Sequence, residues 1–436
     1  MTHLTSRPTP ARARFLLVLL ILLNILNIVD RNLISSFGPQ ISQDLSLSDT
    51  QFGLLTGLIF VFFYAVMGLF VGRLADTKNR PRLITAGLVL WSALTMVSGA
   101  AKSFLHIASA RLFIGVGEAC LTPASMSMLA DTYPSEKRGM AASLYYLGVP
   151  LGAGASFIIA GELGPEIGWR NCFYILGAIG LVFAPIVFFL RDPERGSAEK
   201  TVQATGLEPS NLSQSLKEVY AIAKKSPALA WTMIGSVFMQ LPVGSAQFAQ
   251  IWLVRERGFD AAEIATTYGQ LFIVVGVIGS LFGGIASDWY QQRFNGGRVR
   301  FLAIFMLVVL PFLVGYRLSE PGSDVFYVGM GAGFLALTVF FGPAFSTIQD
   351  LTPPHLRGVT TAILLLFMNL IGLGLGAVIA GVLSDLFQTM GFSEPLTWSL
   401  ICIDLLGLFT IVSFFIASIY WARQNNSENI DKLSSV

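Results

Sequence analysis

The sequence is poor in charge. Asp, Glu, Lys and Arg make up only 12% of its 436 residues, whereas soluble chains carry about 25%. Such sparse charge, beside 54% hydrophobic residues, excludes a globule in water and suits a protein surrounded by lipid. The net charge of +2 leaves no basic stripe, so nucleic-acid binding is not expected.

Cysteine and histidine are also scarce, at three residues each, and no CxxC or Cys/His pairing occurs. This excludes a disulfide scaffold and a zinc site, and neither a metal nor a cofactor is expected. The chain has no Walker P-loop, so it does not use ATP directly. The dispersed histidines and the lack of an H-E-x-x-H motif argue against a membrane-embedded enzyme.

Long apolar stretches, in contrast, are abundant. A helix needs about 20 apolar residues to cross a bilayer core of about 30 Å. The first six stretches lie near 15–37, 50–72, 82–101, 105–130, 138–161 and 170–190, and the next six near 228–254, 262–287, 299–317, 324–349, 357–384 and 395–421. The first continues without a small-residue cleavage motif, so we interpret it as an uncleaved helix rather than a signal peptide.

The order of six stretches, a polar gap and six again predicts an all-α membrane protein with twelve transmembrane helices in two six-helix bundles. The predicted parts are a cytoplasmic tail (1–14), a first bundle (15–190), a cytoplasmic linker (191–227), a second bundle (228–421) and a cytoplasmic tail (422–436). A short surface helix is expected at 213–225. One such chain encloses a complete path, so a monomer is expected.

Basic residues are distributed unevenly over the loops. With both termini inside, the inner side holds 21 Lys and Arg residues and the outer loops hold five. Loops rich in Lys and Arg stay in the cytoplasm, so both termini are predicted to be cytoplasmic. The outer five are Lys102, Arg170, Arg255, Arg257 and Arg317.

The two halves share an internal repeat. Asp131–Gly139 and Asp350–Gly358 both fit D-x-x-P-x-x-x-R-G, and they lie 219 residues apart. A looser pair, Gly72–Asp76 and Gly284–Asp288, is displaced by 212 residues. Single matches of this kind are often ordinary turns, in which Asp caps one helix and Pro stops another. Two matches in corresponding loops favour parallel six-helix repeats, as in one large class of transporters.

These motifs resemble those of the major facilitator superfamily, and the resemblance covers nearly the whole chain. The loop Gly72–Arg80 is similar to the signature between the second and third helices, with Asn79 where a second glycine is common. A smaller branch, the Spinster-type transporters, fits better still. The segments that resemble this branch are Asp30-Arg31, Leu47–Leu54, Trp91-Ser92, Arg111–Ala119 followed by Pro123 and Asp131, and Asp192–Gly196.

The resemblance implies a twelve-helix major facilitator fold and a lipid-like amphiphilic substrate. Lysophospholipids and sphingoid phosphates are the substrates of animal members, whereas bacterial members are less tied to one substrate. A bacterial inner membrane is the expected location, and the expected partners are the substrate, protons and the lipid bilayer.

Four ionisable residues stand out within the apolar stretches, Asp30, Arg31, Arg111 and Glu118, and Asp404 is a fifth candidate. Such residues are functional candidates, because an unpaired charge in the membrane costs several kcal/mol. Arg111 and Glu118 are seven residues apart, which places them on one helix face about 10 Å apart. Gly115 between them leaves room for a helix or a ligand headgroup. Asp30 and Arg111 lie at comparable depth, so an Asp30–Arg111 ion pair is expected.

A conformation that separates Asp30 from Arg111 would favour protonation of the carboxylate, which is a simple proton switch. The Spinster resemblance likewise implies that Asp30 and Glu118 are protonation sites and that Arg111 is their partner. The alternative is a static ion pair that fixes helix packing. Arg31 could bind an anionic headgroup or pair with Asp30, and both readings stay open. A lone Asp404 in the last stretch is expected to face a helix contact.

The loop after the second stretch is a candidate conformational latch. Asp76 can cap a nearby helix and pair with Arg138, because carboxylates favour the positive end of a helix dipole. By resemblance, Gly72, Asp76 and Arg80 belong to a cytoplasmic latch that holds the outward-facing state. The alternative is an ordinary loop anchor.

Polar and aromatic residues in the middle of the stretches are candidates for a substrate cavity, together with Arg31, Arg111 and Glu118. Core packing is the commoner role for any one of them. The second half has few charges at this depth, so a cavity charged on one side and apolar on the other would suit a polar head with a greasy tail. The candidates are Tyr64, Tyr145, Tyr146, Gln247, Phe248, Gln270, Phe340, Phe367 and Asn369.

The function favoured by the sequence is a proton-coupled secondary transporter that moves an amphiphile by alternating access. Two alternatives belong to the same class: a symporter of organic anions such as sugar acids or aromatic carboxylates, and efflux of hydrophobic drugs. A purely structural scaffold is disfavoured, because it would gain nothing from charges inside the membrane.

Overall fold

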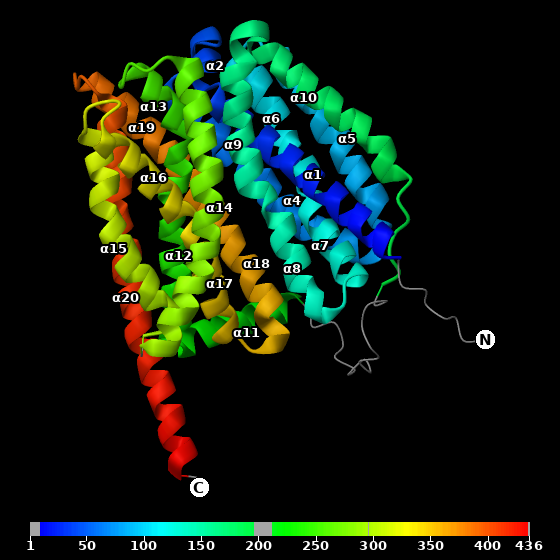
Figure 1. Ribbon diagram of the computed structural model, residues 1–436, viewed down its shortest axis with the longest axis vertical. Coiled ribbons are helices and arrows are strands. Elements are labelled where there is room, and N and C mark those ends of the chain that lie inside the picture. The colour runs from blue at the N-terminus through cyan, green and yellow to red at the C-terminus, as the bar shows by residue number, and fades with distance from the viewer. Residues whose placement is uncertain (1–8, 196–211, 295, 435–436) are drawn as a thin grey trace. The chain divides into compact units, whose positions relative to one another are not determined.

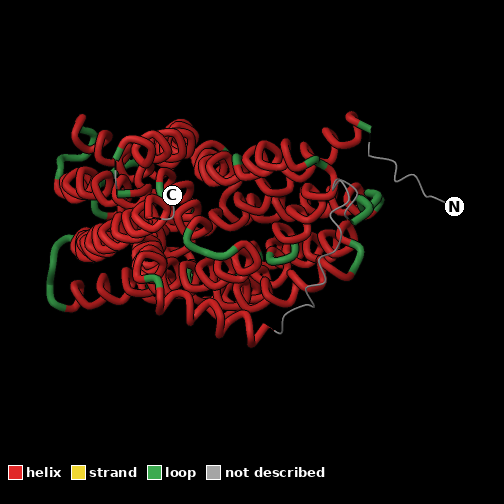
Figure 2. The backbone as a smooth tube through the Cα atoms, turned by 90° about the horizontal axis from the view of Figure 1, so that it is seen from below, coloured by secondary structure: helices red, strands yellow, loops and turns green. Residues whose placement is uncertain are grey.

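The computed structural model describes residues 9–195, 212–294 and 296–434. Within these ranges the chain is helical, with short connections and no strand (Figures 1 and 2). In the first half the helices are α1 Pro10–Ser36, α2 Gly38–Asp44, α3 Asp49–Thr56, α4 Leu58–Thr77, α5 Arg80–Gly99, α6 Phe104–Glu118, α7 Leu121–Thr132, α8 Ser135–Tyr146, α9 Gly148–Glu162 and α10 Gly164–Phe188.

The second half begins with the expected surface helix, α11 Leu212–Lys225, which is confirmed. The remaining helices are α12 Pro227–Ser245, η1 Ala246–Phe248, α13 Ala249–Arg255, α14 Ala261–Arg293, α15 Gly297–Leu318, α16 Asp324–Val339, α17 Phe341–Asp350, η2 Pro354–Leu356, α18 Arg357–Phe367, the π-helix η3 Met368–Gly374, α19 Leu375–Thr389 and α20 Pro395–Ser434.

Twelve segments of the described chain are long and apolar enough to cross a membrane, which confirms the predicted number of spans. At the sixth span, Gly168 takes a non-helical φ of 77° between two helical segments of α10, so the continuous helix begins after Gly168, near the predicted 170. One boundary differs from the prediction. α20 continues to Ser434, so most of the predicted tail 422–436 is helical.

Six of the twelve spans are broken into shorter helices, a feature that apolar length alone does not reveal. The second span, for example, divides into α3 and α4 at Gly57, whose φ and ψ are −103° and −107°. The eleventh divides into α18, η3 and α19. In lipid a break is tolerated only where neighbouring helices or a cavity satisfy the freed backbone groups.

The chain forms two compact units. The first comprises Met1–Gly206 together with Phe248–Ile273, and the second comprises Leu207–Gln247 together with Val274–Val436. The first unit therefore includes η1's last residue, α13 and the beginning of α14, all of which follow the predicted linker in sequence. Part of that linker, residues 196–211, lies outside the described residues.

In the first unit, glycines bring α5 and α10 into close contact. A Cβ atom added at Gly180 would lie 2.0 Å from Ser92 Oγ, and one at Gly177 would lie 2.5 Å from the Ser92 carbonyl oxygen. Small residues allow such close packing where no hydrophobic effect drives helices together in lipid. This scaffold holds α5 in place beside α6.

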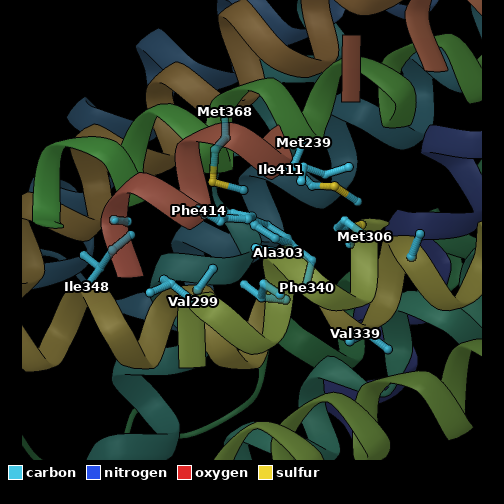
Figure 3. Packing of buried hydrophobic residues seen from close by; sticks show 14 of the residues in the cluster. Met239, Val299, Ala303, Met306, Val339, Phe340, Ile348, Met368, Ile411 and Phe414 are labelled. Carbon is cyan, nitrogen blue, oxygen red and sulfur yellow. The ribbon is translucent and has the colours of Figure 1, made fainter. Parts of the chain in front are cut away.

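The second unit packs around buried apolar side chains from α12, α15, α16, α17 and α20 (Figure 3). Phe340 is 1% exposed and stacks on Phe414, with ring centroids 6.3 Å apart. Phe340 is thus a core residue in this conformation. Its predicted place on a cavity wall stays a prediction.

Candidate functional site

The four charged residues predicted inside the membrane come together in the first unit, where α1 carries Asp30 and Arg31 and α6 carries Arg111 and Glu118. Arg31 Nη2 lies 2.9 Å from Glu118 Oε2, and Arg31 Nε donates to the same oxygen at 3.1 Å. The Glu118 side chain is fully buried, whereas that of Arg31 is 27% exposed. The principal ion pair of the site is therefore Arg31–Glu118.

This pairing corrects the expected Asp30–Arg111 ion pair and disfavours one of the two open readings of Arg31. Among the described residues no ion pair joins Asp30 to Arg111, and Arg31 does not pair with Asp30. Arg111 Nη2 instead donates to the backbone carbonyl of Arg31 at 2.7 Å. Sequence position gives the depth of a residue in the membrane, but the direction in which its side chain leaves the helix depends on packing.

Asp30 is held by a hydroxyl group. Thr95 Oγ1, on α5, lies 2.7 Å from Asp30 Oδ1 and 2.9 Å from the carbonyl oxygen of Trp91. Asp30 is 3% exposed and Thr95 is 1% exposed. A hydroxyl has one hydrogen and two lone pairs. Thr95 can therefore donate to only one of these oxygens at a time, so both contacts are hydrogen bonds together only when the carboxyl group carries a proton and donates to Thr95.

Aromatic rings cover both guanidinium groups. Arg31 Cζ lies 4.4 Å from the ring centroid of Tyr64 and 5.0 Å from that of Phe60, both on α4. Arg111 Cζ lies 4.3 Å from the same Phe60 ring. The negative face of an aromatic ring stabilises a cation, so Phe60 reduces the cost of placing two arginines together. Tyr64, predicted at a cavity wall, belongs to this site.

Glycines on α6 bring the helices close enough for these contacts. A Cβ at Gly115 would lie 2.8 Å from the Phe60 carbonyl oxygen, and one at Gly117 would lie 2.8 Å from the Gly87 carbonyl oxygen. The space that Gly115 was expected to leave is thus taken by α4. Close packing on both sides fixes the depth and direction of Arg111 and Glu118.

Three polar atoms of the site are buried without a hydrogen-bond partner in the structure: Asp30 Oδ2, Glu118 Oε1 and Arg111 Nε. Fully ionised, the two carboxylates and the two guanidinium groups carry no net charge. Buried polar atoms without partners are costly, so this cluster has capacity for a proton or for a polar group of a ligand.

The remaining cavity candidates divide by burial. Tyr145 and Phe248 are fully buried: the Tyr145 hydroxyl lies 3.2 Å from Thr122 Oγ1, and Phe248 packs on Phe52. Like Phe340, these two are buried in this conformation, and their place on a cavity wall stays a prediction. Partly or largely exposed are Tyr146, Gln247, Gln270, Phe367 and Asn369.

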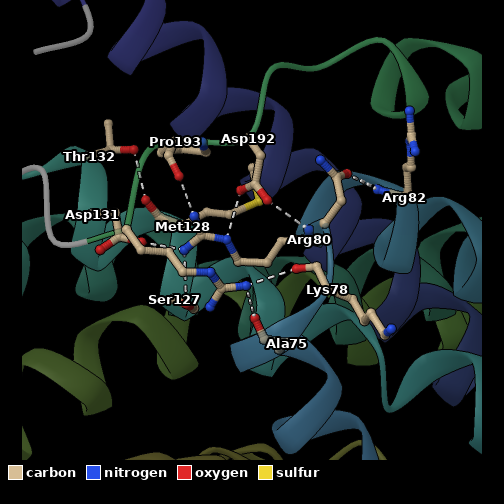
Figure 4. Close-up of polar contacts among 12 residues, drawn as sticks. Ala75, Lys78, Arg80, Arg82, Ser127, Met128, Asp131, Thr132, Asp192 and Pro193 are labelled. Carbon is tan, nitrogen blue, oxygen red and sulfur yellow. Dashed lines mark hydrogen bonds and ion pairs between the residues drawn. The ribbon is translucent and has the colours of Figure 1, made fainter. Parts of the chain in front are cut away.

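The predicted latch contains a fully buried arginine, Arg80, at the start of α5 (Figure 4). Its Nε donates to Asp192 Oδ1 at 2.7 Å, and Nη1 donates to Ser127 Oγ at 3.0 Å and pairs with Asp131. Nη2 donates to the carbonyl oxygen of Pro193. Arg80 therefore ties α5, the end of α7 and the segment after α10 within one unit.

The side chain of Asp76 lies outside the described residues, as does the burial of Gly72, so the predicted Asp76–Arg138 contact stays a prediction. Arg138 Nε donates to the backbone carbonyl of Tyr133 at 3.0 Å.

The second unit repeats this arrangement. Arg298 Nε lies 2.6 Å from Asp288, and its Nη1 lies 2.7 Å from Asp350, the residue that corresponds to Asp131. Arg357 Nε donates to the carbonyl oxygen of Thr352 at 3.2 Å, as Arg138 does to that of Tyr133. Equivalent contacts at equivalent positions support the internal repeat and disfavour a pair of unrelated turns.

Sequence reasoning missed a buried ion pair in the second unit. Arg317 Nε lies 3.1 Å from Asp404 Oδ2, and the two side chains are 9% and 3% exposed. Arg317 was assigned to an outer loop, but α15 extends to Leu318 and directs it against α20. The signal available was Asp404 itself, since a carboxylate in an apolar span needs a cation.

Comparisons with known proteins agree with this architecture. The family model of the Major Facilitator Superfamily matches residues 20–377. The chain is 28% identical over 425 residues to an MFS-type efflux pump of Mycolicibacterium smegmatis, with 97% of this chain and 96% of that one covered. It is 22% identical to Protein spinster homolog 3 of Danio rerio, with 96% and 87% covered.

Two further similarities concern the Spinster branch. A probable sphingolipid transporter, spinster homolog 1 of Arabidopsis thaliana, is 26% identical over 66% of this chain and 69% of its own. The crystal structure of a bacterial homologue of the human lysosomal transporter Spinster, inward-facing and unoccupied, matches with a TM-score of 0.84. The identity is 25%, and 95% of this chain and 99% of that one are covered.

Proposed function

Because this chain belongs to the major facilitator superfamily and, within it, to the Spinster-type transporters, we propose that it carries a lysophospholipid- or sphingolipid-like amphiphile across the membrane, coupled to protons. The names of relatives support a lipid-like substrate, since one is a probable sphingolipid transporter. The observation that carries the coupling is the pair of buried carboxyl groups, Asp30 and Glu118, among two arginines.

The exposed part of the site favours an anionic or zwitterionic head. Of the four charged residues, Arg31 has the most exposed side chain, and Tyr64 beside it is also partly exposed. Arginine presents a planar fork that matches phosphate. A phosphate bound by Arg31 would compete with Glu118 for the guanidinium group, and the displaced carboxylate would then be a buried, unpaired charge.

A proton resolves that conflict. Protonation of Glu118 removes the unpaired charge and frees Arg31 for the headgroup, so proton binding and anion binding favour each other at this site. Asp30 provides a second carboxyl group that shares this environment and has Thr95 as its hydrogen-bond donor. We infer that headgroup and proton occupy the site together, and that the acyl chain follows the aromatic side chains.

Transport into liposomes tests this proposal. Purified protein is reconstituted, a pH gradient is imposed, and movement of a labelled lysophosphatidylcholine is followed beside that of a labelled sugar acid. Gradient-driven lysolipid movement is expected for the wild type and is lost in Asp30→Asn. As a matched control, Asp324→Asn changes an exposed carboxylate at the start of α16 and keeps transport.

The other outcomes are equally informative. Movement of the sugar acid alone would transfer the substrate to the organic-anion class and keep the proton mechanism. Lysolipid movement that ignores both the gradient and Asp30→Asn would overturn the coupling.

Efflux of hydrophobic compounds is the second candidate function, because a relative that matches 97% of this chain is an MFS-type efflux pump. The two functions differ in their need for Arg31. A hydrophobic dye without an anionic head needs no contact with the Arg31 guanidinium group. Arg31→Gln should therefore spare dye efflux and abolish lysolipid movement. Dye efflux in wild-type vesicles without any lysolipid movement would favour this second function.

A further inference from the structure

Two asparagines interrupt the apolar surface of α1 on the side of the charged cluster where α1 begins. Asn24 and Asn27 lie within the first span, and each is 3% exposed. Residues three apart on a helix are neighbours on its surface, with about 5–6 Å between their Cβ atoms. Asn24, Asn27 and Asp30 therefore form a continuous polar row along α1 that ends at the carboxyl group.

Polar residues of α7 lie at the same depth as this row. The first span and the fourth, which contains α6 and α7, run in opposite directions, and the ion pair between α1 and α6 fixes their register. Each helical residue advances about 1.5 Å. Thr122, four residues after the carboxylate of that ion pair, is thus level with Asn27, and Ser125 is level with Asn24. α1 and α7 are in contact.

Tyr145, at the end of α8, contacts both helices. Asn24 Nδ2 donates to the backbone carbonyl of Tyr145 at 2.8 Å, and the Tyr145 hydroxyl lies 3.2 Å from Thr122 Oγ1. Tyr145 is fully buried, whereas Tyr146 beside it is 49% exposed, and the two rings meet edge-on with centroids 5.4 Å apart. The polar residues therefore extend from the buried carboxyl group to a side chain at the surface. We call the following group the polar track: Asn24, Asn27, Thr122, Ser125 and Tyr145.

Two side chains of the polar track are buried with polar atoms that have no hydrogen-bond partner among the described residues, Asn27 Nδ2 and Ser125 Oγ. They are 3% and 0% exposed. An asparagine that only joins helices donates across the contact, as Asn24 does. Asn27 makes no such bond through Nδ2. Buried polar groups of this kind are usually satisfied by internal water, which makes about three hydrogen bonds to the protein.

The row is polar on one side of Asp30 only. Leu33 and Phe37, which follow Asp30 at the next two turns of α1, are 0% and 1% exposed. Apolar surroundings do not hold ordered water, because water needs polar partners. The polar track thus leads from Asp30 toward the side of the membrane on which α1 begins, and not toward the opposite side.

We propose that the polar track binds internal water and is the route by which protons pass between Asp30 and the side of the membrane on which α1 begins. The proposal rests on the proposed function in one respect, that Asp30 is a protonation site. The amide and hydroxyl groups hold the water molecules in a row. Each water accepts one proton and passes on another, and the carboxylate of Asp30 accepts the last, so no side chain of the polar track changes its charge.

Infrared spectroscopy can follow this proton directly. Purified full-length protein in lipid nanodiscs is given a pH jump, and the C=O stretch of the protonated carboxyl group is recorded over time. The band that is missing in Asp30→Asn belongs to Asp30. Asn27→Leu keeps the size of the side chain but offers water no hydrogen bond. It should slow the Asp30 band by about tenfold or more, the effect on a rate of losing one hydrogen bond to a charged species.

The equilibrium titration separates a route from a structural effect. Loss of a route slows proton uptake and proton release by the same factor, so the pH midpoint of the Asp30 band should stay in place. Asn27→Ser restores a polar group at the same position and should recover most of the wild-type rate. Tyr145→Phe removes only a hydroxyl and keeps the ring, so it should slow the band without a change of packing.

The chain provides a matched control on another span. Asn171, on α10, is exposed and donates to the carbonyl oxygen of Ile167 in its own helix at 2.7 Å. Asn171→Leu makes the same exchange of side chains away from the polar track and should leave the rate unchanged. A thermal unfolding scan of each variant verifies that the bands come from folded protein.

The outcomes distinguish the route from the proposed function. Wild-type rates in both Asn27→Leu and Tyr145→Phe would overturn the polar track and leave Asp30 as a protonation site. Equal slowing in Asn27→Leu and Asn27→Ser would also overturn it, because polarity at residue 27 would then not matter. If no band at any pH depends on Asp30, both the route and the proposed proton coupling fail. The measurement uses no lysolipid, so its result is independent of the substrate.

Discussion

Thr95 has one hydrogen and two acceptors within reach, Asp30 Oδ1 and the Trp91 carbonyl oxygen. When Asp30 is ionised, the hydroxyl donates to the carboxylate. When Asp30 is protonated, its own O–H can donate to Thr95, and the threonine hydrogen turns toward Trp91. The same side chain thus satisfies both protonation states by the rotation of a single bond, which keeps proton exchange possible at a carboxyl group that is only 3% exposed.

Replacement of this hydroxyl should uncouple transport from the gradient. Thr95→Val keeps the shape of the side chain but leaves Asp30 without a hydrogen-bond partner in either state. We expect gradient-driven lysolipid accumulation to fall about tenfold or more, the effect of losing a hydrogen bond to a charged group. Exchange of lysolipid across the membrane without a gradient should persist, because it requires no net proton transfer.

Thr95→Ser keeps the hydroxyl and should retain both activities. If Thr95→Val accumulates substrate as well as Thr95→Ser does, Asp30 does not use this hydroxyl.

The sequence identified the members of this cluster but not their partners. Charges within apolar spans are conspicuous, so Asp30, Arg31, Arg111 and Glu118 could be selected from composition alone. The Arg31–Glu118 pair could not be foreseen, because adjacent residues on α1 point in directions about 100° apart and only the packing of α4 and α6 decides which one meets Glu118.

At the scale of elements, two equivalent arginines differ in burial. Arg80 is fully buried among Asp131, Asp192 and two further oxygen acceptors. Arg298, its counterpart in the second unit, has an 18% exposed side chain and pairs with carboxylates that are 55% and 45% exposed. The same contact pattern is therefore expected to contribute more to the free energy of unfolding in the first unit than in the second.

Alanine substitution should reveal this difference. Arg80→Ala leaves two carboxylates without their buried cation and should destabilise the protein by about 3–5 kcal/mol. Arg298→Ala removes a largely solvated contact and should cost about 1 kcal/mol or less. Thermal unfolding of both variants in detergent measures the contrast, and equal losses would contradict the burial argument.

Glycine substitution tests how closely α5 and α6 pack. Gly117→Ala would place a methyl group 2.8 Å from a backbone oxygen of α5, beside Glu118. Overpacking of this kind costs about 1–3 kcal/mol and should also impair transport, because Glu118 would shift. Gly331→Ala on α16, where a Cβ would meet nothing within 4 Å, provides the control and should leave unfolding and transport near wild type.

The breaks within six spans could not be predicted from the sequence. Apolar length predicted one span at 105–130, whereas the structure has α6 and α7, with a join at Ala119 and Cys120. Hydrophobicity is continuous across such a join, and the backbone turns only because neighbouring helices satisfy the freed groups. Bounds of spans were therefore predictable, but their internal geometry was not.

At the scale of the whole molecule, the twelve spans and the repeat were both predictable, because each rests on patterns that repeat along the chain. The distribution of basic residues also predicts the orientation in the membrane, with both termini in the cytoplasm.

Reporter fusions measure the orientation of the chain in the membrane. A fluorescent protein fused after Val436 should fold and fluoresce in cells, whereas alkaline phosphatase at the same site should be inactive. The opposite result is expected for fusions made after Glu320, in the connection that follows α15. Active phosphatase at Val436 would invert the assigned orientation.

The composition of the first compact unit has a consequence for how the polypeptide can be divided. The chain passes from one unit to the other after Gly206, after Gln247 and again after Ile273. A single protease cut within 196–211 would therefore not release an intact first unit, because α13 and the beginning of α14 would remain on the other fragment. The two fragments would therefore have to stay associated to keep the contacts of the first unit.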